Sequence, residues 1–134
     1  MKKVGVTVAT QQDVHTHLIE NKWIEVEGEF DELTHVYKST WNLPGDRSQV
    51  IWAVINKTFF QLLSPFAKDT ELSADRALNA NPTLFGMGKY LGHYCLVNLG
   101  VVSQFSAAEF DVMGAIIATF ADEIEKNSGG GDIL

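Results

Sequence analysis

The sequence predicts an α+β fold: a mostly antiparallel sheet with an N-terminal helix, a short linking helix and a long C-terminal helix. Three observations support this prediction. Segments 50–55 and 96–102 are apolar at both alternating positions, which is typical of strands buried on both faces. Turn residues such as those at 44–46 separate neighbouring strand segments. Finally, Ser106 and Glu109 form a capping-box pattern ahead of an apolar stripe with helical spacing.

The N-terminal part predicts one helix and one half-buried strand. Thr10 is the expected N-cap with Asp13 at the capping-box position, and Asn21 is a good helix terminator. From residue 23 to 30, apolar and polar side chains alternate. The apolar face holds Ile24, Val26 and Phe30, and the solvated face holds Glu25, Glu27 and Glu29.

The middle of the chain predicts five further strands and a short helix. β-rich runs separated by turn signals indicate the strands, and Asn81-Pro82 is expected to stop the helix. The expected strands are 35–43, 49–55, 58–63, 85–90 and 94–103, and the expected helix is 73–79. The predicted element order is therefore α-β-β-β-β-α-β-β-α.

The C-terminal helix has the strongest pattern. Its apolar stripe predicts a broad contact with the sheet, whereas its acidic residues are expected to face solvent. The stripe comprises Phe110, Met113, Ile117, Phe120 and Ile124, and the acidic residues are Asp122, Glu123 and Glu125. We expect one domain over residues 1–126 and a flexible glycine-rich tail over 127–134.

Composition limits the classes of partner. The chain of 134 residues fits a single domain, and its formal net charge of −7 argues against nucleic acid and against an anionic membrane surface. The single cysteine, Cys95, cannot form an intramolecular disulfide and suits a reducing compartment. The first residues are too short an apolar run for a signal peptide, and no run approaches the ~20 residues of a membrane span. We therefore expect a cytoplasmic protein.

Several segments together resemble the YbjN family and, more distantly, the type III secretion chaperone-like fold, and a group of small cyanobacterial proteins is also similar. The resemblance covers about residues 49–126. It is carried by the apolar strand 50–55, the strand end 63–66, the linking-helix residues 78–81, the strands 85–90 and 94–102, and the helix end 121–125. Residues 23–43 match no pattern of the secretion chaperones.

The resemblance implies a small, acidic, non-enzymatic protein that is usually dimeric. Chaperone members of the fold bind an extended client segment across their sheet and helix surfaces, and regulatory roles are proposed for YbjN members. Accordingly we expect a homodimer that binds a client protein in a chaperone-like, assembly or regulatory role. Fold analogy alone does not fix function.

Candidate catalytic and metal-binding residues are few. His93 and Cys95 share a strand face and could form a nucleophile pair, but Cys95 lies in an apolar run that favours plain packing. His15 and His17 are two apart on a helix and therefore do not share a face. The position of His35 does not complete a set of metal ligands with them. A row of strand carboxylates could bind Ca²⁺, although a solvated face is far more common. No catalytic residue, metal or cofactor is expected.

The segment 86–89, Gly-Met-Gly-Lys, looks like part of a phosphate-binding loop. Both the Walker pattern and the dinucleotide pattern fail, because Thr83 and Leu91 stand where glycines are required. The glycines are expected to serve a strand bulge or a close packing contact.

Protein binding is the leading functional hypothesis, because the central strands carry more apolar side chains than one layer of helices covers. Tryptophans are strong candidates for either core or interface positions. The predicted buried or interface positions are Trp41, Val50, Trp52, Val54, Leu99 and Val101. The alternative is a small-molecule-binding sensory domain with an apolar pocket between sheet and C-terminal helix and inward polar groups such as Asn98.

Overall fold

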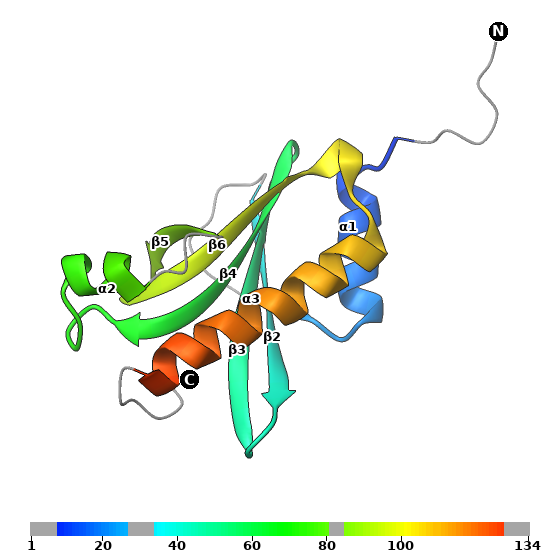
Figure 1. Ribbon diagram of the computed structural model, residues 1–134. Coiled ribbons are helices and arrows are strands. Elements are labelled where there is room, and N and C mark those ends of the chain that lie inside the picture. The colour runs from blue at the N-terminus through cyan, green and yellow to red at the C-terminus, as the bar shows by residue number, and fades with distance from the viewer. Residues whose placement is uncertain (1–7, 27–33, 81–84, 128–134) are drawn as a thin grey trace, which may run out of the picture.

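A computed structural model describes residues 8–26, 34–80 and 85–127, and it confirms the α+β class and the predicted element order (Figure 1). The helices are α1 (Gln11–Glu20), α2 (Ala74–Ala80), the 3₁₀ turn η1 (Val102–Gln104) and α3 (Ala107–Asn127). The strands are β1 (Ile24–Glu25), β2 (His35–Leu43), β3 (Arg47–Ile55), β4 (Phe59–Lys68), β5 (Gly86–Tyr90) and β6 (His93–Val101).

The strands form one antiparallel sheet of six strands in the order β1-β2-β3-β4-β6-β5. Strands β2 to β4 follow one another as hairpins, and β6 then pairs with β4 while β5 lies at the outer edge. The long central strands β3, β4 and β6 therefore receive neighbours on both sides, and the short strands β1 and β5 lie at the two edges.

Helices α1 and α3 lie on the same face of the sheet (Figure 1), which we call the helix face. Helix α3 crosses β3, β4 and β6, and the main core lies between it and these strands. Alternate strand residues such as Ile51, Ala53 and Ile55 point into this core and are fully buried. From α3, Phe110, Ile117 and Ile124 meet them, which confirms the predicted apolar stripe.

Helix α1 has the predicted ends. The Thr10 and Asp13 side chains each accept a hydrogen bond from the other residue's backbone N–H, which completes the capping box. Asn21 is the C-cap, and its side-chain amide donates to the carbonyl of His17. Val14 and Leu18 are the buried residues of this helix.

Glycines permit two close approaches on the helix face. Gly114 of α3 faces the Trp41 ring, and a Cβ at this position would lie 3.2 Å from Trp41 Cζ2. Gly100 of β6 pairs with Phe60 of β4, whose ring lies across the glycine. A Cβ at Gly100 would lie only 2.2 Å from Phe60 Cζ, so this ring position requires glycine.

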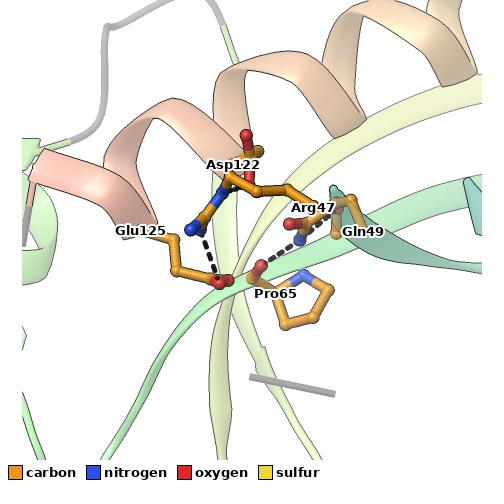
Figure 2. A network of polar contacts seen from close by, with 6 residues as sticks. Arg47, Gln49, Pro65, Asp122 and Glu125 are labelled. Carbon is orange, nitrogen blue, oxygen red and sulfur yellow. Dashed lines mark hydrogen bonds and ion pairs between the residues drawn. The ribbon is translucent and has the colours of Figure 1, made fainter. Parts of the chain in front are cut away.

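The prediction that the acidic residues near the end of α3 face solvent is wrong for two of the three. Asp122 and Glu125 are 5% and 2% exposed, and both pair with Arg47 at the start of β3 (Figure 2). Arg47 Nε donates to Asp122 Oδ1 at 2.6 Å and Arg47 Nη2 donates to Glu125 Oε1 at 3.1 Å. The helix periodicity places both carboxylates beside the sheet. The ion pairs with Arg47 across the interface offset the free-energy cost of burying them.

Beside this ion pair, the buried side chain of Gln49 links two central strands. Its amide nitrogen donates to the carbonyl oxygen of Pro65 (Figure 2) and to Ser64 Oγ. The Ser64 hydroxyl donates to the carbonyl of Val50. These bonds satisfy polar groups next to the register shift that β4 makes between Pro65 and Ala67.

The first strand is shorter than expected. Only Ile24 and Glu25 form β1, and Ile24 is 72% exposed, so the predicted half-buried apolar face is wrong at this residue. The predicted positions Glu27, Glu29 and Phe30 lie outside the described residues. So does the predicted tail beyond Asn127, where α3 ends.

Across the described ranges, no helix is both long and apolar enough to cross a membrane.

The contact between Gly100 and Phe60 makes a testable prediction. We expect Gly100→Ala to lower the free energy of unfolding by about 1–3 kcal/mol, because the added methyl group displaces the Phe60 ring. Chemical denaturation measures this change. Gly86→Ala is the control, since its Cβ would make an ordinary 3.5 Å contact with the carbonyl oxygen of Val97. Equal stability of the two variants would contradict the prediction.

The buried ion pair makes a second prediction. Arg47→Met is expected to lower the free energy of unfolding by about 3 kcal/mol, because it leaves two buried carboxylates without their cation. Lys126→Met removes an exposed cation from the same end of α3 and is the matched control. If urea denaturation gives the same loss for both variants, the ion pair does not stabilise the α3–sheet contact.

Candidate functional site

The face of the sheet opposite α1 and α3, which we call the open face, has its own small core. Val36, Val50, Trp52, Leu63 and Cys95 are buried there, with Val26, Val54, Tyr90 and Val97 packed around them. The ring of Trp52 is 3% exposed and meets Tyr90 edge to face at a centroid distance of 5.0 Å. Of the predicted interface residues, Val50 and Trp52 are therefore covered within the single chain.

One end of the open face is not covered by the described residues. Phe59 and Val101 are opposite each other on β4 and β6 and are 41% and 44% exposed. Leu99 lies two residues before Val101 on the same face and is 58% exposed. Val54 of β3 is half-buried on this face, and the half-buried Gln61 of β4 lies between Val54 and Leu99 in the strand register. We call Val54, Phe59, Leu99 and Val101 the apolar patch. It contains three of the predicted interface residues.

Trp41, the remaining predicted residue, lies on the helix face of the sheet. Its ring packs on Gly114 of α3 and is half-buried. It also lines a groove whose other walls are Asn21, Trp23, Ser39, Thr40, Asn42 and Asp111. In the described ranges, β1 pairs only with Tyr37 and Lys38 of β2, so the outer edge of residues 39–43 has no strand beside it.

A cavity of about 210 Å³ opens between the sheet and the first turns of α3. Its apolar lining comes from both layers, and its polar lining is concentrated near η1 and the start of α3. The apolar residues are Phe60, Leu62, Val101, Phe110 and Met113; Asn98, Gln104, Ser106 and Glu109 are polar; and Gly100 completes the lining. This is the place where an apolar pocket with Asn98 was predicted.

His93 and Cys95 do share a strand face, but their surroundings do not suit catalysis. Cys95 is fully buried, and burial raises the pKa of its thiol to about 12, so it carries no thiolate at neutral pH. His93 Nδ1 is hydrogen-bonded to the carbonyl of Leu91 at 2.9 Å rather than to the thiol. The pair therefore packs as a structural element of the open face.

The histidines of α1 point in different directions, as their spacing predicts. His15 Nδ1 is hydrogen-bonded to the Tyr37 hydroxyl at 2.8 Å, and its ring meets that of His35 at 4.8 Å. His17 Nε2 instead pairs with Asp111 of α3 at 2.8 Å. Over residues 8–26, 34–80 and 85–127, no group of three or more His, Cys, Asp or Glu side chains could hold a metal ion.

Burial is the main cause that lowers the pKa of His15, and the neighbouring His35 lowers it further, while the charge of Glu25 acts in the opposite direction. Burial likewise raises the pKa of Tyr37, with Glu25 adding to the rise. The uncharged forms of both side chains are thus favoured where α1 meets β2.

Sequence reasoning missed Phe59 and most of the cavity. Phe59 has the same strand parity as Gln61 and Leu63, so alternation along β4 places it on the open face once the helix side is known. Gln104 and Glu109 line the cavity only because η1 turns the chain back toward β6, and no local pattern signals that turn.

Comparison with protein-family models finds no match to this chain, and none of the curated proteins is significantly similar to it. The resemblance to the YbjN and secretion-chaperone families therefore stays a prediction.

The surroundings of His15 predict a pH dependence of stability. Because the folded pKa lies below the ordinary value of 6.5, the unfolded chain takes up the proton first as the pH falls. Stability is therefore full above pH 6.5 and is lost as the pH falls from 6.5 through the folded pKa. Urea denaturation between pH 7.5 and 5 should show a smaller loss for His15→Gln than for the wild type. Parallel losses in both proteins would contradict this assignment.

Proposed function

We propose that this protein is a non-catalytic, cytoplasmic protein-binding factor that acts as a homodimer in a chaperone-like, assembly or regulatory role. The observation that carries the proposal is the apolar patch on the open face, where Phe59, Leu99 and Val101 are each more than 40% exposed. Large apolar side chains exposed together on one face of a sheet mark protein-interaction sites.

A second copy of the chain is the proposed occupant of the apolar patch. Gln61, which lies between Val54 and Leu99, is polar but uncharged, so two copies can meet at the patch without burying like charges between its members. Twofold symmetry brings the same patch from each subunit together, and homodimers of this type are the commonest oligomers. The strongly acidic chain then keeps its charge on the remaining surface.

A client segment is proposed to bind at the outer edge of β2. Residues 39–43 present strand backbone beside the groove that Trp41 and Trp23 line. An extended peptide can add to such an edge through main-chain hydrogen bonds, and neighbouring pockets then select its side chains. Trp41 supplies an aromatic wall for such a pocket while its ring is held by Gly114.

The second candidate function is a small-molecule-binding sensory domain. The cavity between β6 and α3 favours it, because an apolar lining combined with a few polar groups is typical of ligand pockets. The cavity and the apolar patch share Val101 and otherwise use different residues, so this function and protein binding are compatible in one molecule.

The dimer proposal predicts the effect of a charge in the apolar patch. Leu99→Asp is expected to convert the dimer to a monomer, because two copies of the aspartate would be buried against each other. Light scattering coupled to size exclusion measures the mass. Val112→Asp is the matched control, since Val112 is 59% exposed on α3 and lies outside the patch. A monomeric wild type, or a dimer that tolerates Leu99→Asp, would contradict the use of the patch.

A further inference from the structure

The chemistry of the cavity lining indicates which ligand the second candidate function would involve. Along β6 the helix-face positions are Tyr94, Leu96, Asn98 and Gly100, so a carboxamide interrupts an otherwise buried row. Asn98 is half-buried and lines the cavity, and in the part of the chain that the structure describes its side chain has no hydrogen-bond partner. The polar atoms of Asn98 are not fully buried, so they are accessible to solvent and to a ligand in the cavity. Their position favours a ligand with a hydrogen-bonding group.

The size of the cavity limits the ligand. An engineered cavity of about 150 Å³ lined by apolar side chains binds benzene in another protein. At about 210 Å³, this cavity has room for one ring with a short substituent. The rings of Phe60 and Phe110, 5.5 Å apart between centroids, form its aromatic side. An aromatic or branched aliphatic group would pack there.

The charge of the lining selects the polar end of the ligand. Of the described residues that line the cavity, Glu109 is the one that carries a charge, and none of them is a lysine or an arginine. Among the described residues the Glu109 carboxylate makes no ion pair or side-chain hydrogen bond. A carboxylate at the edge of an apolar cavity attracts a cation and repels an anion.

We propose that the cavity binds a small primary amine with an aromatic or branched aliphatic body. The ammonium group pairs with the Glu109 carboxylate and donates to Asn98 Oδ1, while the apolar body packs against Phe60, Phe110 and Met113. The inference rests on the second candidate function, because it names the ligand class of that same cavity.

Phenethylamine is the probe, with 2-phenylethanol and 3-phenylpropionate as uncharged and anionic analogues of similar shape. Titrations followed by ¹⁵N-HSQC spectra give the dissociation constants and show which amides shift. We expect the amine to bind about tenfold more tightly than the alcohol, as a charge-assisted hydrogen bond allows, and the acid to bind weakest. The shifted amides should be those of β6, η1 and the first turns of α3.

Two variants test the roles of Glu109 and Asn98 in binding. Glu109→Gln is expected to weaken phenethylamine binding about tenfold and to leave 2-phenylethanol binding unchanged, because only the amine uses the carboxylate. Glu109 is exposed, so this variant retains its fold. Asn98→Leu should weaken both ligands. Glu123→Gln, on an exposed position of α3 outside the cavity, is the matched control and should bind phenethylamine like the wild type.

The outcomes separate the ligand class from the small-molecule function itself. If the alcohol or the acid binds as tightly as the amine and shifts the same amides, the amine class is wrong and a small-molecule site stands. If none of the three probes shifts the cavity amides, the amine class and the small-molecule site are both wrong. An amine affinity that is equal in wild type and Glu109→Gln would also overturn the assignment of Glu109.

Discussion

The contact between α3 and the central strands is the interaction on which the rest of the structure depends. Helix α3 presents one apolar stripe, and β3, β4 and β6 present alternate residues that meet it. The C-terminal end of α3 is held by Arg47, which neutralises two buried carboxylates of the helix (Figure 2). Near its N-terminal end the helix leaves the cavity open between its first turns and β6. One contact therefore fixes both the core and the position of the cavity.

The same contact accounts for the open face of the sheet. Because the helices α1 and α3 pack on one side, the apolar residues of opposite strand parity must find cover elsewhere. Around Trp52 the chain supplies this cover itself, with Tyr90 from the edge strand β5 packed against the indole. Toward Phe59 and Val101 the described residues supply none, and the apolar patch remains. The asymmetry between the two faces is the physical basis of the proposed protein binding.

Exposed and enclosed apolar surfaces suit different partners. The apolar patch is built from exposed strand residues without charge, which suits another protein surface. The cavity beside α3 is small, and its lining includes a carboxylate and a carboxamide that has no hydrogen-bond partner among the described residues, which suits a small polar molecule with an apolar body. Val101 contributes to both, because it is exposed on the open face and also lines the cavity. Ligand binding at the cavity would therefore occur next to the proposed dimer contact.

The sequence by itself determined the fold class, the element order, the caps of α1 and the stripe of α3, because these depend on local propensity and on hydrophobic periods of two and 3.6 residues. The capping box predicted for α3 forms only in part: the Glu109 backbone N–H donates to Ser106 Oγ, whereas the Glu109 carboxylate makes no side-chain hydrogen bond among the described residues. Periodicity also placed Val50 and Trp52 in buried rows. It could not assign Asp122 and Glu125, since their burial depends on Arg47, which lies far away along the chain. Only the tertiary structure decided which apolar rows the chain covers, that Phe59 is exposed beside Leu99, and that Asn98 and Glu109 share one cavity. The reason is physical: local patterns show which apolar side chains gain free energy from burial, whereas contacts between distant segments decide which of them are buried.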